Sequence, residues 1–236
     1  MSMSFPLAYS IERAGRGAER SSAATDETVF DRLERAPVRT LKSREHLFRT
    51  GEDKTNIYQV LEGAIVQYRL RTDGRRQITG FAVTGDMVGL GASISHCGSA
   101  ESSGNSKVRA LAANALHGMA RENSHLGMHL YDAVSRELAA TQDLLTMVGK
   151  LNAGERVATF LLSLARRRAR GLGAAERLDL PMTRCDIGDF LGLTTETISR
   201  TLTKLAIGQI ISRHQGHIRI LDVLGLEAVS AGDQPL

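Results

Sequence analysis

The sequence contains few cysteines and no long apolar segment. Cys97 and Cys185 are its two cysteines, too few for the disulfide framework of a small secreted domain and typical of a reduced compartment. No apolar run approaches the roughly 20 residues that a membrane-spanning helix needs. The N-terminal stretch MSMSFPLAYS lacks the basic start and apolar core of a secretory signal. These absences predict a cytoplasmic protein with no membrane partner.

A recognisable catalytic arrangement is also missing. Neither cysteine stands with any of the seven histidines in a context that pairs a nucleophile, a base and an orienting acid. Hydrophobic residues nevertheless make up 42% of the 236 residues, enough for one large core or two modest ones. We therefore expect a globular protein that is not an enzyme, and we predict no catalytic residue, cofactor or metal ligand.

Basic residues are concentrated in the C-terminal part of the chain. Residues 1–149 contain 18 Lys and Arg against 17 Asp and Glu, whereas residues 150–220 contain 12 against 6. A local excess of positive charge is what contacts to DNA phosphates require. Solubility alone could also account for a modest excess, so the distribution supports nucleic-acid binding without requiring it.

The basic segment includes residues 183–206, TRCDIGDFLGLTTETISRTLTKLA, which have the pattern of two short helices joined by a sharp turn. Thr183 and Asp186 have the spacing of an N-terminal capping box. Gly188 leaves room for a second helix to cross closely, and Gly192 suits the left-handed residue that ends a helix. The segment predicts a helix-turn-helix, with an ordinary helical hairpin as the alternative.

The second helix of this unit has one apolar and one polar face. Thr194 or Thr195 is its predicted N-cap, and Ile198, Leu202 and Leu205 recur at the spacing of an inward face. The residues that must then point away from the core are Glu196, Ser199, Arg200 and Thr203. A helix that reads the DNA major groove presents a polar face in this way.

The N-terminal half has the sequence pattern of short β-strands. Residues 57–61, 64–71 and 76–83 alternate or run apolar and are rich in β-branched side chains. The Asp73-Gly74 pair between two of them is a strong hairpin signal. Residues 85–91, GDMVGLG, form either a simple turn or a bend that could cradle a phosphate through backbone N–H groups. Strands at this spacing predict a small antiparallel roll.

Residues 121–150 predict one long helix with an apolar seam. At 1.5 Å per residue such a helix is about 42 Å long, too long to bury its apolar side against a small roll. The seam residues recur at alternating steps of three and four, as in a coiled coil: Tyr131, Val134, Leu138, Thr141, Leu145 and Val148. We therefore predict a homodimer formed through this helix, with packing across the roll as the alternative.

The remaining segments complete the C-terminal unit. A further helix, ahead of the helix-turn-helix, is expected over residues 153–169. Two short strands joined by a tip are expected over residues 210–213 and 217–221, which makes the helix-turn-helix a winged one. The patterns together predict an α+β fold of four parts. These are a flexible leader (1–25), an antiparallel β-roll of the double-stranded β-helix or jelly-roll type (26–120), a long dimerisation helix (121–150) and a winged helix-turn-helix domain (151–236).

A strand roll, a long dimer-type helix and a winged helix-turn-helix, in this order, resemble the CRP/FNR family of bacterial transcription regulators. The likeness covers about residues 30–225, and residues 182–200, MTRCDIGDFLGLTTETISR, resemble its FNR and FixK-type branch. The resemblance implies a homodimeric activator that binds double-stranded DNA and contacts RNA polymerase. It also implies a role in genes for low-oxygen respiration and nitrogen fixation.

Four residues of the second helix are the predicted DNA contacts. Glu196, Ser199 and Arg200 match the residues that read a TTGA-like half-site in that branch. Arg200 suits guanine, whose O6 and N7 accept a forked donor, and Glu196 can accept a hydrogen bond from N4 of the paired cytosine. Thr195 lies at the helix start, where a phosphate or a flanking base is within reach. The alternative for Glu196 and Arg200 is a plain surface pair four residues apart.

The roll departs from the ligand-binding members of the family. Those that bind cyclic nucleotides carry an arginine shortly after the glycine bend, whereas here no Lys or Arg occurs between residue 91 and Lys107. Iron–sulfur sensing needs about four cysteine thiolates, and no cysteine precedes Cys97. His96 and Cys97 would rarely converge on one haem iron, because adjacent residues alternate faces on a strand. We expect no small-molecule effector; the alternative is a ligand-gated regulator of the same family.

Cys185 is the predicted redox-regulatory residue. It falls in the first turn of the first helix of the helix-turn-helix, beside Arg184, where a helix dipole favours negative charge. Oxidation of its thiol would add polarity or negative charge close to the DNA backbone. The hypothesis is that oxidation weakens DNA binding, and the alternative is a small side chain at a tolerant position.

Overall fold

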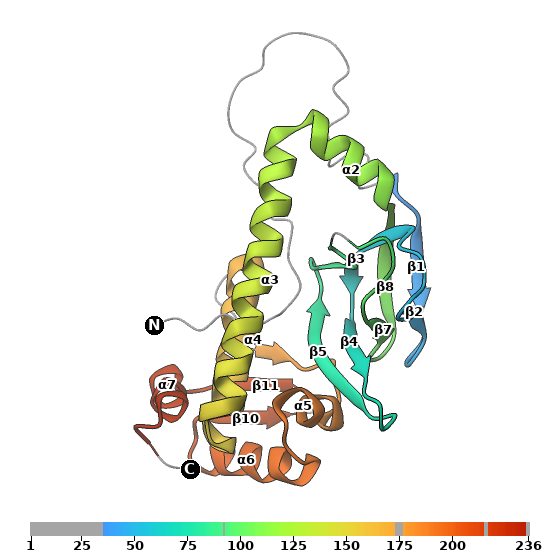
Figure 1. Cartoon of the computed structure of the whole chain (residues 1–236). Coiled ribbons are helices and arrows are strands. Elements are labelled where there is room, and N and C mark those ends of the chain that lie inside the picture. The colour runs from blue at the N-terminus through green and yellow to red at the C-terminus, as the bar shows by residue number, and fades with distance from the viewer. Residues whose placement is uncertain (1–34, 92, 173–176, 215–216, 235–236) are drawn as a thin grey trace, which may run out of the picture.

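The computed structural model describes residues 35–91, 93–172, 177–214 and 217–234. A long helix runs from the upper end of a β-roll down to a smaller helical domain (Figure 1). The predicted leader at 1–25 and the residues 215–216 of the predicted wing tip lie outside the described residues.

The roll consists of two four-stranded antiparallel sheets, with strand orders β1-β8-β3-β6 and β2-β7-β4-β5. Its strands are β1 (Val38–Leu41), β2 (His46–Phe48), β3 (Asn56–Glu62), β4 (Ala64–Leu70), β5 (Arg76–Val83), β6 (Met87–Val88), β7 (Ser99–Ser102) and β8 (Ser106–Ala112). Buried apolar side chains from both sheets fill the space between them, among them Leu41, Val60, Ile65 and Val108. The predicted antiparallel roll is confirmed.

Two of the predicted turns of the roll, the Asp73-Gly74 hairpin and the glycine-rich bend, are present in the structure. Gly74 adopts φ +79° in the β4–β5 hairpin, the conformation that the Asp-Gly signal predicts. Within the glycine-rich bend, Met87 and Val88 are buried and pair with β3. The Asp86 carboxylate accepts a hydrogen bond from the Val83 backbone N–H at 2.6 Å. The bend is therefore a turn that leads into a short strand of the roll.

The long helix is interrupted, and its boundaries differ from the prediction. The structure has α2 (Ala113–Glu122) followed by α3 (Ser124–Lys150), so helix begins inside the segment predicted as roll. Between them, Asn123 has an extended backbone, and its side chain accepts a hydrogen bond from the Leu126 backbone N–H. Asn123 is thus the N-cap of a new helix. The spacing of the apolar residues, on which the predicted helix over 121–150 is based, does not reveal such a break.

The C-terminal domain contains four helices and a small sheet among the described residues. The helices are α4 (Ala153–Leu172), α5 (Arg184–Leu191), α6 (Thr195–Ile207) and α7 (Val223–Ala231), and the sheet orders its strands β10-β11-β9. Strands β10 (Ile211–His214) and β11 (His217–Ile220) are the two predicted wing strands. Strand β9 (Arg177–Asp179) was not predicted, because three residues are too few to show a period of two.

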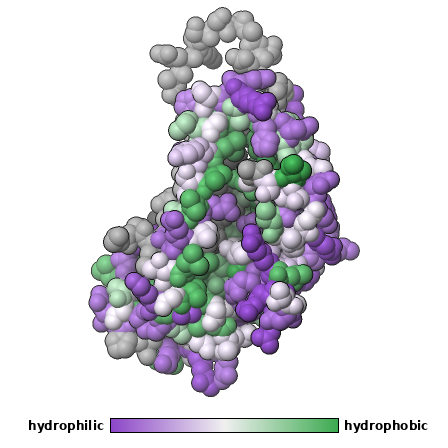
Figure 2. Space-filling model, viewed as in Figure 1, coloured by the Kyte–Doolittle hydropathy of each residue, from purple (hydrophilic) through white to green (hydrophobic). Residues whose placement is uncertain are grey.

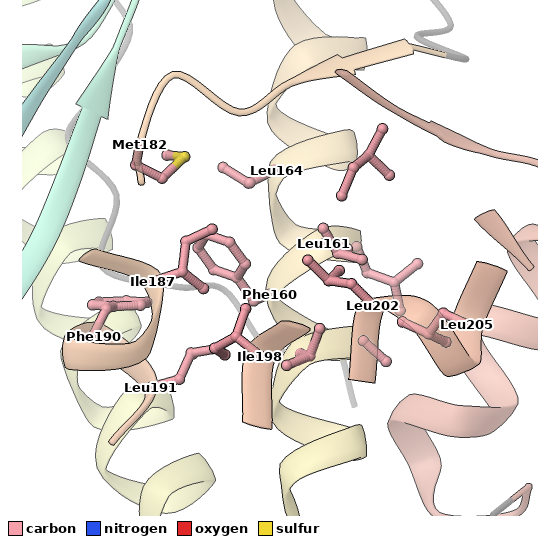
Figure 3. Close-up of a cluster of buried hydrophobic side chains, with 14 of the residues drawn as sticks. Phe160, Leu161, Leu164, Met182, Ile187, Phe190, Leu191, Ile198, Leu202 and Leu205 are labelled. Carbon is pink, nitrogen blue, oxygen red and sulfur yellow. The ribbon is translucent and has the colours of Figure 1, made fainter. Parts of the chain in front are cut away.

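Apolar side chains from α4, α5 and α6 converge on one core. Figure 3 shows Phe160 of α4, Ile187 and Leu191 of α5, and Ile198 of α6 pointing toward one another. The same cluster extends into the roll, where it includes Phe81 of β5. None of the helices in the described part of the chain combines the length and apolar character needed to cross a bilayer.

Candidate nucleic-acid interface

The first helix of the candidate interface, α5, begins with the predicted capping box. The Asp186 backbone N–H donates to Thr183 Oγ1, and the Thr183 backbone N–H donates to Asp186 Oδ2, both at 3.1 Å. Two of the N–H groups that a helix start leaves without partners are thereby satisfied. The start of α5 is consequently fixed by its own sequence.

The turn between α5 and α6 depends on two glycines. Gly192 adopts φ +67° and ends α5, and an L-residue with a side chain rarely adopts this conformation. A Cβ on Gly188 would lie 2.6 Å from the Leu193 carbonyl oxygen, so the turn can fold back closely only over glycine. Thr194 is the N-cap of α6, because its Oγ1 accepts a hydrogen bond from the Thr197 backbone N–H at 3.1 Å.

The inward and outward faces of α6 are those predicted from the spacing. Ile198, Leu202 and Leu205 are at most 3% exposed. Thr195, Glu196, Arg200 and Thr203 are exposed, and Ser199 is half-buried beside them. The structure thus places all four predicted DNA-contact residues on α6, with Glu196, Ser199 and Arg200 on its outer side.

Glu196 and Arg200 form an ion pair along the outer face of α6. Their side chains are 70% and 76% exposed, so the pair adds little to stability. Both groups remain accessible to an incoming ligand. The carboxylate can orient the guanidinium, because the two residues are four apart on one face of the helix.

Two arginines that the sequence reasoning did not assign flank this face. Arg184, the first residue of α5, donates to Ser199 Oγ at 3.3 Å. Arg213 of β10 donates to Thr203 Oγ1 at 3.1 Å. The basic excess of residues 150–220 was the available signal, but charge counting cannot show which arginines lie beside α6.

Cys185 is exposed in the first turn of α5. It also lies near the roll, because the carboxylate of the next residue, Asp186, is 3.6 Å from the guanidinium of Arg44, which precedes β2. The pKa of Arg44 is raised, mainly through its hydrogen bond to Glu101; burial opposes this rise, and the charges of Asp186 and Glu101 add to it. The thiol is therefore close both to the candidate interface and to the roll.

The predicted seam residues of α3 lie together on its exposed side. Tyr131, Leu138 and Leu145 are 66%, 60% and 71% exposed, and Figure 2 shows apolar side chains along this part of the surface. Val134, Thr141 and Val148 are also exposed. On the opposite side, Met147 is fully buried. The seam is not covered by the roll within the described chain.

His96 and Cys97 of the roll have different surroundings. The His96 ring stacks on Phe48 with centroids 3.5 Å apart and is 5% exposed. Burial, assisted by the charge of Lys54, lowers the pKa of His96. Cys97 is exposed and donates to Ser93 Oγ at 3.3 Å. Side chains that face a core and the solvent, respectively, do not converge on one metal ion.

Comparison with known families gives a match over each half of the chain. Residues 38–123 match the cyclic nucleotide-binding domain family, and residues 155–229 match the Crp-like helix-turn-helix domain family. The first match coincides with the roll and α2, and the second with the winged helix-turn-helix domain.

Characterised relatives resemble most of the chain. The nitrogen fixation regulation protein FixK of Bradyrhizobium diazoefficiens is 39% identical over 189 residues, which cover 80% of each chain. The transcriptional activatory protein AadR of Rhodopseudomonas palustris is 37% identical, over 80% of this chain and 79% of the relative. The solved structure of FixK2 from Bradyrhizobium japonicum superposes with a TM-score of 0.76 at 35% identity, and the match covers 82% of this chain and 96% of that one.

Proposed function

Since this chain belongs to the CRP/FNR family of DNA-binding transcription regulators, we propose that it is a homodimeric activator that binds a palindrome of TTGA-like half-sites. The observation that carries the proposal is the outward face of α6, on which Glu196, Ser199 and Arg200 are accessible together. The capping box and the close turn hold this helix so that its polar face points away from the core, as insertion into a major groove requires.

Each residue of this face has a base-edge partner in such a half-site. The Arg200 guanidinium donates to O6 and N7 of guanine, and Glu196 accepts from N4 of the paired cytosine while orienting Arg200. Ser199 is small enough to approach a thymine methyl group or an adjacent base edge. Thr195, at the start of the helix, contacts a phosphate or a flanking base. Arg184 and Arg213, on either side, supply phosphate contacts.

Selection of DNA from a random pool tests the proposed recognition. At a stated salt concentration, we expect enrichment of a palindrome with TTG-type half-sites whose centres are about two helical turns apart, because each half-site faces one subunit of a symmetric dimer. The enriched sequences are read by sequencing. Enrichment of single, unpaired sites, or of half-sites without guanine, would contradict the proposal.

We propose that the dimer forms through the seam on α3. Replacing Leu138 with glutamate is expected to convert the dimer to monomers, because it would place an unpaired carboxylate in an apolar helix–helix contact. Sedimentation velocity measures the change as a halved mass. Leu70→Glu is the control, since Leu70 is equally exposed, at 62%, but lies on β4 of the roll. A Leu138→Glu protein that remains dimeric would place the interface elsewhere.

We propose that the roll acts without a small-molecule effector. Its interior is occupied by its own buried side chains, and the described residues after the bend carry no Lys or Arg before Lys107 to neutralise a phosphate. An unpaired phosphate in a partly buried pocket is costly. The match to a cyclic nucleotide-binding domain favours the alternative, a ligand-gated regulator. A rise in melting temperature with added cyclic nucleotide would establish that alternative.

The biological setting is proposed from the relatives. The names of FixK and AadR describe a nitrogen fixation regulator and a transcriptional activator. For this chain we propose activation of genes for low-oxygen metabolism and nitrogen fixation, through contact with RNA polymerase. Transcript profiling of a deletion strain at low oxygen would test this, and unchanged transcripts would refute it.

We propose that oxidation of Cys185 weakens DNA binding. The thiol is exposed in the first turn of α5, and a sulfenic or sulfinic acid there would bring polarity or negative charge toward the DNA phosphates. Treatment with peroxide is expected to lower the DNA affinity of the parent protein and to leave Cys185→Ala unaffected, as measured by fluorescence anisotropy. Cys97→Ala is the control, because Cys97 is exposed but lies in the roll. Equal loss in the parent and Cys185→Ala proteins would exclude the mechanism.

A further inference from the structure

The roll and the DNA-binding domain meet where β5 packs against α4 and α5. Phe81 of β5 contacts Phe160 of α4 and Phe190 of α5, with ring centroids 6.1 and 5.2 Å away. All three rings are at most 1% exposed. Such an apolar contact brings the domains together, but it is non-directional and fixes their mutual angle poorly.

A group of four charged side chains lies at the edge of this contact. Glu101 of β7 and Asp186 of α5 are 4% and 0% exposed, and the guanidinium groups of Arg44 and Arg76 bridge them. Arg44 Nη1 is 2.7 Å from Glu101 Oε1 and 3.6 Å from Asp186 Oδ1. Arg76 pairs with Glu101 through Nη1 and lies 3.3 Å from Asp186 Oδ1 through Nη2. Three of these residues belong to the roll, and the fourth caps the first helix of the helix-turn-helix.

The geometry of this charge cluster is directional. Separating a buried carboxylate from its charged partners is costly, so a rotation of α5 that withdrew Asp186 from the two guanidinium groups is strongly opposed. Arg76 offers one side of its planar fork to each carboxylate, an arrangement that a lysine cannot reproduce. The Arg76 guanidinium also lies 5.4 Å from the centre of the Tyr68 ring on β4. Arg76 is therefore held on the roll side as well.

The second arginine is held in place by the backbone of the roll. Arg44 adopts φ +65°, a left-handed conformation that residues with side chains rarely adopt. Its backbone N–H donates to the Ser102 carbonyl at 2.8 Å, which fastens this turn to β7 beside Glu101. The unusual backbone thus aims the guanidinium at the two carboxylates.

Two neighbouring hydrogen bonds join the same domains. Gln77 Nε2 of β5 donates to the Asp189 carbonyl of α5 at 3.3 Å. Ser103 Oγ donates to the Pro181 carbonyl, ahead of α5, at 2.9 Å. Both α5 and the segment leading into it are consequently attached to the roll by polar contacts.

We propose that Arg76, together with Arg44, is a positioning residue for DNA recognition: by holding Asp186 at the start of α5, it fixes the angle between the roll and α6. In a dimer joined through α3, this angle sets the distance between the two recognition helices and hence the half-site spacing that the protein accepts. The proposal rests on the dimeric DNA recognition proposed above. It assigns a specificity role to a roll residue that has no place on the DNA-facing surface.

The test compares Arg76→Gln with the parent protein and with Arg75→Gln, all as full chains. Arg75 is the neighbouring exposed arginine and serves as the matched control. Affinity is measured for the selected palindrome and for versions with one base pair added or removed between the half-sites. Arg76→Gln is expected to bind the selected palindrome about tenfold more weakly, a size typical of coupling between separate sites. It is also expected to lose most of the parent's preference for the selected spacing.

The other outcomes overturn the proposal in distinct ways. Weaker binding with an unchanged spacing preference would reduce Arg76 to a general stabilising residue. If the slope of log affinity against log salt became less steep by about 0.9, Arg76 would be a phosphate contact instead. Affinity and spacing preference equal to those of Arg75→Gln would show that the charge cluster does not position α6.

A second measurement is independent of DNA. Backbone ¹⁵N relaxation reports the rotational correlation times of residues 38–112 and 180–231 separately; we expect equal times in the parent and diverging times in Arg76→Gln. Equal times in both proteins would overturn the inference, whereas a parent protein that selects no palindrome contradicts only the proposed function. If Arg76→Gln does not fold, Arg44→Gln replaces it, since Arg44 is 46% exposed. A smaller change in the same direction is expected, and no change overturns the inference.

Discussion

Replacing Gly188 with alanine is expected to lower the free energy of unfolding of the DNA-binding domain by about 3 kcal/mol, the upper part of the range for overpacked sites. The added Cβ would lie 2.6 Å from the carbonyl oxygen of Leu193. That oxygen belongs to the backbone of the turn, so it cannot rotate away as the end of a flexible side chain could. Either the turn opens or α6 moves relative to α5, and in both cases the recognition face is displaced.

The control for this substitution is Gly118→Ala in α2. A Cβ on Gly118 would meet no atom within 4 Å, so only the helix propensity changes, and stability should rise by up to about 1 kcal/mol. Urea denaturation of both variants therefore gives opposite signs for the same chemical change. Equal effects at the two positions would show that the α5–α6 turn tolerates a side chain, and that its closeness is not what requires glycine.

The elements that could be predicted are those specified by nearby residues. The capping box of Thr183 and Asp186 and the left-handed Gly192 depend on neighbours within one helical turn, so their residue types and spacing suffice. The faces of α6 follow from its 3.6-residue period. For the same reason, the exposed seam of α3 could be recognised from its spacing, although the sequence does not show what covers it.

The features that were missed depend on contacts distant in sequence or on very short segments. Strand β9 forms because β11 offers it a partner 40 residues later, as in the pairing of Leu178 with Ile218. Asp186 reads as a capping residue in the sequence, and that role is confirmed. Its second role, as the partner of Arg76, spans 110 residues. A sequence pattern carries no information about which arginine such a carboxylate will meet.

Replacing Arg200 with alanine is expected to remove about 1–3 kcal/mol of discrimination at one guanine of the half-site, because a bidentate contact to O6 and N7 is lost. The measured quantity is the ratio of affinities for the selected palindrome and for a version changed only at that base pair. Absolute affinity is a poorer measure. Without its partner, the exposed Glu196 carboxylate is left facing the DNA, and its repulsion from the phosphates weakens binding to every sequence.

Two further substitutions separate base reading from charge. Arg200→Lys keeps the charge but lacks the planar fork, so much of the discrimination should still be lost while general affinity is largely retained. Arg213→Ala removes a proposed phosphate contact beside α6. This substitution should weaken binding to specific and to scrambled DNA equally. It should also make the slope of log affinity against log salt less steep by about 0.9. If Arg200→Ala instead behaved like Arg213→Ala, Arg200 would be a backbone contact, and the half-site would have to be read by Glu196 and Ser199 without it.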